Sequence, residues 1–226
     1  DAQGDDHGPG SYTYPTNAVF TPNCFDMVSF ECREGDDEVA FSVRLASEIT
    51  NPWNSGIGLS VQTVDIYIDT DHELGSGLTE ALGGRRVEFE PECAWEYAVW
   101  VEGWNQKVFA ADGSEVGGIT AAVDSVNNVV SISVPKSIIG SPQPGWGFQV
   151  FVLGQEGFPV QGNLRVREVM EQAAEWRFGG GDDGMYDPNV IDMLVPAGRV
   201  QEDILGAYDV KAKKLAEVPM VYPGFE

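Results

Sequence analysis

The chain has little positive charge and no long hydrophobic run. Its 226 residues include 13 Lys and Arg against 36 Asp and Glu, which gives a formal net charge of -23 and a pI near 4.1. Because binding to phosphates needs many basic side chains, this charge excludes nucleic acid as a partner. No stretch is long and apolar enough to span a bilayer, so we expect no membrane insertion. The sequence also shows no basic-then-apolar leader, and we expect a mature, secreted chain.

Histidine and cysteine are scarce as well. His7 and His72 are the two histidines, and the sequence has neither an HExxH nor a GxSxG motif. These absences argue against the common zinc hydrolases and against Ser-His-Asp catalysis. The three cysteines (Cys24, Cys32 and Cys93) allow at most one internal disulfide and form no zinc-binding pattern. We therefore expect that the chain is not an enzyme.

Several segments alternate apolar and polar residues with the period of a β-strand. Residues 38–45 ("EVAFSVRL") and 64–70 ("VDIYIDT") do so clearly, and both are predicted to be half-buried strands. The same period appears in residues 94–104, 128–135 and 147–154. Turn signals separate these segments, which is typical of an antiparallel β-sandwich.

Helical spacing of apolar residues is convincing only in "VREVMEQAAEWRF", residues 166–178, which we predict to be a helix. The predicted fold class is therefore all-β, an antiparallel β-sandwich with one or two short helices. No internal repeat or low-complexity linker divides the chain. We expect a single module over residues 1–226, with residues 196–226 as a trailing C-terminal segment of strands and turns.

The acidic residues gather in clusters, as the ligands of a hard cation would. Calcium takes six to eight oxygens from carboxylates and backbone carbonyls, and nearby Gly and Pro let carbonyls turn inward. A weaker DxD candidate, Asp69 and Asp71, follows a predicted strand, where a solvated strand end is the simpler interpretation. The first predicted calcium site comprises Asp1, Asp5, Asp6 and Asp26, and the second comprises Asp182, Asp183, Asp187 and Asn189.

Tryptophans suggest a second kind of site, since an exposed Trp face can stack on a sugar ring. Core packing is the commoner role of Trp, and we expect Trp95 and Trp146 to be interior. Trp100 lies on the polar face of its predicted strand and is the best candidate for an exposed ring. Trp104 and Trp53 are the other candidate carbohydrate-binding residues.

Several longer blocks resemble a known family. They are "GDDHGPGSYTYPTN", "FDMVSFE", "NPWNSGIGLSVQTVDIYIDTD", "AWEYAVWVEGW", "GWGFQVFVLGQEGF" and "EWRFGGGDDGMYDPNVIDMLVP", in this order along nearly the whole chain. Together they resemble the C-terminal module of glucodextranase. The resemblance implies a non-catalytic, extracellular β-sandwich related in fold to DOMON-like and family-9 carbohydrate-binding domains. It also implies attachment to a cell surface or polysaccharide, and a module that is appended to an enzyme.

Two other functions stay open at this stage. One is a structural subunit that forms a filament or surface layer by strand exchange, because the C-terminal "PMVYPGFE" (residues 219–226) is apolar enough to add to a neighbour's sheet. Such a chain would be its own partner in a homo-polymer. The other is haem binding, which the DOMON-like relatives suggest and for which only His and Met could serve as axial ligands.

Overall fold

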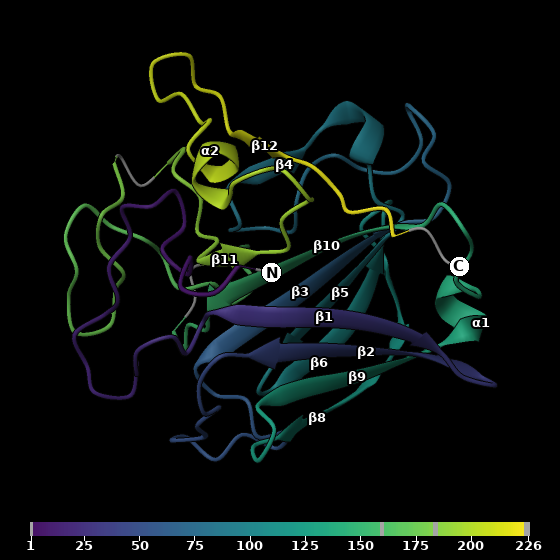
Figure 1. Cartoon of the computed structure of the whole chain (residues 1–226), viewed down its shortest axis with the longest axis horizontal. Helices are drawn as coiled ribbons and strands as arrows, with labels where there is room; N and C mark the ends of the chain where they lie inside the picture. The colour runs from purple at the N-terminus through teal and green to yellow at the C-terminus, as the bar shows by residue number, and fades with distance from the viewer. Residues whose placement is uncertain (1, 159–160, 183–184, 224–226) are drawn as a thin grey trace.

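The computed structural model describes residues 2–158, 161–182 and 185–223, and it is built almost entirely from β-strands. Figure 1 shows two sheets stacked face to face, with a layer of shorter elements above them. The helices of the described residues are short: α1 (Lys136–Ile139), α2 (Gln201–Leu205) and the 3-10 helix η1 (Pro91–Cys93). The predicted all-β sandwich with short helices is confirmed.

Neighbouring strands in the two large sheets run antiparallel. The four-stranded sheet has the order β1 (Met27–Glu34), β2 (Glu38–Leu45), β9 (Val129–Pro135), β8 (Thr120–Asp124). The six-stranded sheet has the order β11 (Asp192–Met193), β10 (Gly147–Gly154), β3 (Gln62–Asp69), β5 (Tyr97–Glu102), β6 (Asn105–Ala110), β7 (Glu115–Gly118). A parallel pair, β4 (Val87–Phe89) and β12 (Ala216–Val218), completes the sheets.

The six-stranded sheet packs on both of its faces. Toward the four-stranded sheet, Ile66 and Val150 join Phe41 in a first hydrophobic core. On the opposite face, Tyr67 and Phe151 belong to a second core, which β4, β12 and α2 cover from above in Figure 1. The arrangement is therefore a sandwich with a third, partial layer.

Because the six-stranded sheet is covered on both faces, β3 and β10 are more deeply buried than their alternating sequences indicate. Residues 38–45 alternate as predicted, with Val39, Phe41, Val43 and Leu45 inside. The prediction of half-burial is wrong for residues 64–70, because every residue of β3 is buried, and the alternating residues 147–154 of β10 are buried throughout as well. Polar residues on their second face, such as Asp65 and Gln149, lie beneath the upper layer and are paired there.

The helix predicted for residues 166–178 is also wrong, since the structure has bridges and turns there. Val166 bridges Gln155, and Val169 bridges Phe178, so the segment folds back on itself. Val166 enters the second core while Val169 enters the first. The apolar residues at helical spacing belong to two cores, which lie on opposite sides of the six-stranded sheet. A non-helical segment can contact both cores.

Residues 196–223, the C-terminal segment as far as it is described, contain α2 and β12 and supply part of the second core. Ile204, Leu205 and Val218 are buried there. Farther along, Val221 exchanges backbone hydrogen bonds with Phe148 of β10, at 2.8 Å in both directions. The terminal residues 224–226 of the predicted exchange strand lie outside the described residues. No helix in the described ranges is long and apolar enough to cross a membrane.

An ion pair between Asp65 and Arg85 is buried within the second core. Both side chains have no exposed area, and Arg85 donates from Nε to Oδ2 at 2.6 Å and from Nη2 to Oδ1 at 2.8 Å. Burial alone disfavours the charged guanidinium, but the Asp65 carboxylate outweighs it and raises the pKa of Arg85. Nη1 of Arg85 donates to the carbonyls of Gly83 and Asn163, so the pair also fixes two covering loops.

Replacing Arg85 with Met tests how much this pair contributes. The substitution leaves the Asp65 carboxylate buried without a cation, and we expect the free energy of unfolding to fall by about 3–5 kcal/mol. Arg33→Met is the matched control, because the Arg33–Glu31 pair is exposed and should contribute less than about 1 kcal/mol. Urea unfolding followed by tryptophan fluorescence measures both. An equal loss of unfolding free energy in the two variants would show that the buried pair stabilises the fold no more than the exposed pair does.

Candidate functional site

A pocket with three tryptophans lies at one end of the sandwich. Trp53 comes from the loop between β2 and β3, Trp104 from the turn between β5 and β6, and Trp176 from the segment after β10. They surround a cavity of about 450 Å³, a volume within the usual range of small-ligand sites. The other lining residues are Gln155, Glu156, Gly157, Phe158, Arg167 and Arg177.

The three tryptophans are partly exposed. Their exposed fractions are 38% for Trp53, 46% for Trp104 and 37% for Trp176. The rings of Trp53 and Trp176 are adjacent, with centroids 6.1 Å apart and planes inclined by 53°. Phe20 supports Trp176 from behind through an edge-to-face contact of 6.0 Å. Aromatic faces that open to solvent at a cavity are suited to an apolar surface of a ligand.

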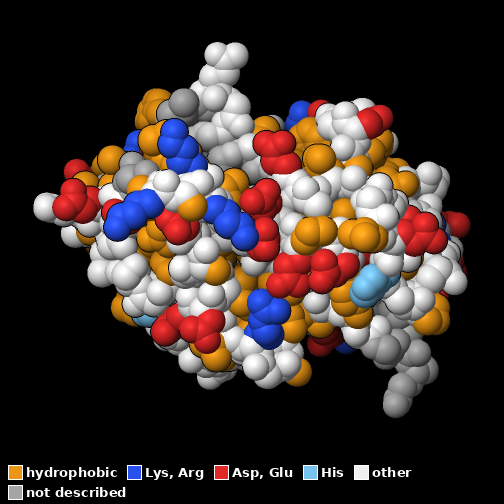
Figure 2. All heavy atoms as spheres, turned by 90° about the horizontal axis from the view of Figure 1, so that it is seen from above, with side chains coloured by type: hydrophobic (Ala, Val, Ile, Leu, Met, Phe, Trp, Pro, Cys, Tyr) orange, Lys and Arg blue, Asp and Glu red, His pale blue; other side chains and the backbone are white. Residues whose placement is uncertain are grey.

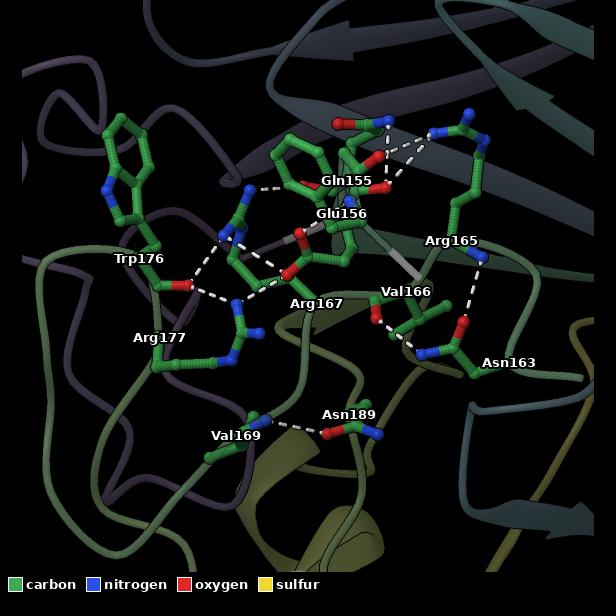
Figure 3. A network of polar contacts seen from close by, with 12 residues as sticks. Gln155, Glu156, Asn163, Arg165, Val166, Arg167, Val169, Trp176, Arg177 and Asn189 are labelled. Atoms are coloured by element: carbon green, nitrogen blue, oxygen red, sulfur yellow. Dashed lines mark hydrogen bonds and ion pairs between the residues drawn. The ribbon is translucent and has the colours of Figure 1, made fainter. Parts of the chain in front are cut away.

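A buried ion network forms the polar wall of the pocket. Figure 3 shows Arg167 and Arg177 both pointing toward the Glu156 carboxylate and the carbonyl of Trp176. Arg167 donates to Trp176 O at 2.5 Å and to Gln155 O at 2.6 Å, and it lies 3.5 Å from Glu156. Arg177 hydrogen-bonds the same Glu156 oxygen. These contacts hold the carboxylate and both guanidinium groups in fixed positions.

Arg167 is nearly fully buried, and its burial lowers the pKa of the guanidinium to about 10. The group therefore stays charged at neutral pH. It lies over the ring of Phe20 at 5.2 Å and near that of Trp176 at 6.0 Å, distances at which a cation and an aromatic face attract. Arg167 thereby links the ion network to the aromatic wall.

A second group of interest consists of three carboxylates from distant parts of the chain: Asp5, Asp26 and Asp192. One carboxylate oxygen from each lies within 4.8 Å of the others. Asp26 and Asp192 are buried, and Asp5 is partly buried. Burial raises the pKa of all three carboxyls, most strongly that of Asp192, and repulsion from neighbouring carboxylates, Asp6 among them, adds to the effect.

A third group joins Asp69, Asp71 and Glu96, whose oxygens also lie within 4.8 Å of one another. Asp69 is buried, so the interpretation of this DxD as a solvated strand end is wrong. Its oxygens accept hydrogen bonds from the His72 amide at 2.7 Å and from the Tyr222 hydroxyl at 2.6 Å. Glu96 accepts from the Thr70 amide at 2.7 Å. Local donors therefore satisfy these carboxylates.

Asp6, the remaining described residue of the predicted first calcium site, is not in this carboxylate group, although its charge helps to raise the carboxyl pKa of Asp5 and of Asp26. Asp1 is outside the described residues. Asp6 is buried and accepts a hydrogen bond from the Tyr14 hydroxyl, with His7 at 3.8 Å. Asp192, which the sequence interpretation did not nominate, takes the third position beside Asp5 and Asp26. No sequence signal marks it, because its neighbours are supplied by segments more than 160 residues away.

The predicted second calcium site is spread over different environments. Asp182 is exposed and Asp187 is buried, while Asp183 lies outside the described residues. The Asn189 amide is occupied by structural hydrogen bonds, accepting from Val169 N at 2.8 Å and donating to Gly84 O at 2.7 Å. In the described part of the chain, neither Asp182 nor Asp187 has its carboxylate close enough to two other acidic, His or Cys side chains to share one ion with them.

The tryptophan predictions are confirmed in part. Trp95 and Trp146 are interior, with 1% and 3% exposure. The expectation that Trp100 is exposed is wrong, because this ring is 4% exposed and lies beside Phe109 in the sheet. Trp53 and Trp104 do come together at the pocket. Sequence analysis missed Glu156, Arg167, Trp176 and Arg177, and the misplaced helix over residues 166–178 concealed the last three.

The fold is thus a β-sandwich that carries an aromatic pocket in the loops at one end. The family profile of the C-terminal, SLH-like binding module of glucodextranase matches residues 1–222. The chain belongs to this family, as the sequence blocks indicated. Comparison with curated proteins gives no match.

The raised carboxyl pKa values predict how the cation-free protein responds to pH. A carboxyl whose pKa is higher in the folded state binds more protons when folded, so its contribution to stability grows as the pH falls toward the unfolded value of about 3.9. That contribution is lost as the pH rises through the folded pKa. In chelator, the wild type should gain stability from about pH 7 to about pH 5, and Asp192→Asn should gain less.

Urea unfolding at several pH values measures this difference. Asp36→Asn removes an exposed carboxylate and controls for the general effect of lowering a net charge of -23. Parallel pH profiles for wild type, Asp36→Asn and Asp192→Asn would contradict the assigned shift at Asp192.

Proposed function

We propose that this chain is a non-catalytic, extracellular attachment module that binds a sugar residue of a cell-surface or other polysaccharide in the pocket of Trp53, Trp104 and Trp176. The observation that carries the proposal is the pocket itself, where three partly exposed Trp rings meet a fixed Glu156–Arg167–Arg177 network. Membership of a family of binding modules supports it independently. The same membership supports association with a cell surface.

The pocket matches the two kinds of surface that a sugar presents. The C–H faces of a pyranose are apolar and pack on aromatic rings, while its hydroxyls need hydrogen-bonding groups at the edges. Arg177 uses Nη1 for its bonds to Glu156 and Trp176 O, so its other guanidinium nitrogens can donate to a hydroxyl or carboxylate. Gln155 lines the same pocket, and Arg165 donates to the backbone carbonyls of the lining residues Glu156 and Gly157.

The position and rigidity of the pocket favour recognition. Loops at one end of a rigid sandwich commonly carry binding residues, and here three such segments converge. Glu156 and Arg167 are held by buried hydrogen bonds before any ligand arrives. A pre-organised wall reduces the entropy cost of binding, which matters for a ligand as polar as a sugar.

Calcium is the cofactor that we propose for the same module. The acidic clusters of the sequence motivated it, and the group of Asp5, Asp26 and Asp192 supports it, because three converging carboxylates suit a hard cation. Its role would be structural, by stabilising the folded module through binding to the native state alone.

Pull-down on insoluble polysaccharides tests the pocket. The panel comprises cross-linked dextran, starch, cellulose and chitin, and the bound fraction is measured over a range of protein concentrations. We expect Trp53→Ala and Trp176→Ala each to weaken binding by about tenfold or more, since aromatic anchors commonly contribute more than 1 kcal/mol. Leu74→Ala is the control, because this exposed side chain lies outside the pocket. Unchanged binding by both Trp variants would rule out the pocket as the glycan site.

A structural subunit remains the second candidate, and one feature favours it. β1 is the edge of the four-stranded sheet, eight residues long. An apolar groove of about 210 Å³ runs beside it, lined by Phe30, Cys32, Phe148, Leu194, Val221 and Pro223. A strand from another copy could add to this edge, because edge strands present unpaired backbone groups.

Negative-stain electron microscopy distinguishes this candidate from an attachment module. A subunit that polymerises through its sheet edge should form regular filaments or layers in millimolar calcium, and chelator should disperse them if the metal holds the ends of the chain in place. Monodisperse particles in both conditions would exclude self-assembly under those conditions and leave the attachment module.

A further inference from the structure

Three segments that are far apart in the sequence bring their carboxylates to one place. Asp5 lies in the N-terminal segment, Asp26 precedes β1, and Asp192 begins β11. Gly4 donates its amide to Asp26 Oδ2 at 2.9 Å, and Gln201 donates to the Asp5 carbonyl at 2.5 Å. Asp192 accepts from the amides of Met27 at 2.5 Å and Met193 at 2.7 Å. The three carboxylates are thus positioned by the fold.

The group has buried oxygen atoms without partners. Asp26 is 1% exposed, and its Oδ1 makes no hydrogen bond within the described structure. Oδ1 of Asp5 is likewise buried and without a partner there. No ion pair among the described residues includes Asp5, Asp26 or Asp192, so three carboxylates converge without a basic side chain. Burying a charged acceptor without a hydrogen-bond partner costs free energy. A buried, unpartnered oxygen in a native fold therefore indicates a bound ligand such as an ion or a water.

The chemistry of the donors indicates which ligand. A calcium ion binds oxygens at about 2.3–2.6 Å, so oxygens on opposite sides of one ion lie about 4.6–5.2 Å apart. The three carboxylates meet this limit with oxygens within 4.8 Å of one another. The group contains carboxylates alone, without His or Cys, which favours a hard cation over zinc. Waters and backbone carbonyls can complete the coordination.

We infer that Asp5, Asp26 and Asp192 form a calcium site that ties the N-terminal segment to the start of β1 and to β11. This inference rests on the calcium part of the proposed function and is independent of the glycan pocket. It replaces the predicted partners Asp1 and Asp6 with Asp192. The group of Asp69, Asp71 and Glu96 does not qualify, since none of its carboxylate oxygens is both buried and without a hydrogen-bond partner in the described structure, unlike Oδ1 of Asp5 and of Asp26.

The site also has a structural connection to the pocket. Asp5 and Asp26 bracket a segment whose aromatic residues pack beneath the pocket wall. Phe25 contacts Phe178 at 5.1 Å, and Phe20 contacts both Phe178 and Trp176. A calcium ion that fixes both ends of this segment would therefore stabilise the support of Trp176.

Isothermal titration of chelator-treated protein with calcium chloride tests the inference. We expect one saturable site in the wild type that Asp26→Asn and Asp192→Asn each weaken by tenfold or more. Two controls should bind like the wild type: Asp36→Asn removes an exposed carboxylate, and Glu96→Gln alters the other carboxylate group. Each Asn variant is nearly isosteric with Asp, and circular dichroism in chelator checks that it folds. Asp5→Asn, at a partly exposed position, provides a third variant that does not disturb the interior.

The outcomes separate the site from the wider proposal. Loss of binding in the Asp5, Asp26 and Asp192 variants with retention in both controls supports the site. Calcium binding that survives these variants overturns the site while leaving calcium as a cofactor. No binding to the wild type at millimolar calcium overturns both. Polysaccharide pull-down by the wild type, Trp53→Ala and Trp176→Ala, at one fixed calcium concentration, tests the pocket separately from the calcium site.

Discussion

The buried ion pair of Asp65 and Arg85 connects the middle of the six-stranded sheet to the layer that covers it. One guanidinium reaches the carboxylate on β3 and the carbonyls of two separate loops, and the Arg85 carbonyl accepts from the amide of Asn189. The Asn163 loop continues into Arg167 of the pocket, and Asn189 precedes Asp192 by three residues. Both candidate sites therefore depend on loops that this pair holds in place.

Negative charge dominates the surface, and the basic residues have particular positions within it. Seen from above, acidic side chains are spread over the face that β4, β12 and α2 cover, and Lys and Arg gather mainly toward one end (Figure 2). Of the 13 basic residues, Arg85 and Arg167 are buried, each beside a carboxylate. In a chain of net charge -23, such cations neutralise interior carboxylates, and the Asp26 group has none.

The N-terminal segment couples the two sites because it touches both. It supplies Asp5 and Asp26 to the carboxylate group and Phe20 to the back of Trp176. Phe20 contacts Trp176 edge to face and lies under the Arg167 guanidinium, so the position of the N-terminal segment affects the position of the pocket wall. These contacts give the segment from Asp5 to Asp26 a physical reason to be ordered despite the mutual repulsion of its carboxylates.

The sequence by itself determined the β-sandwich class, the family, the interior Trp95 and Trp146, and two of the three pocket tryptophans, because alternation and composition are local properties. Only the tertiary structure decided the rest. The third layer buried β3, β10 and Trp100 on their polar faces, and two cores drew residues 166–178 out of a helix. Asp192 lies beside Asp5 and Asp26 because segments far apart in the sequence meet there, as in the hydrogen bond from the Met27 amide to Asp192, a contact that no local pattern encodes.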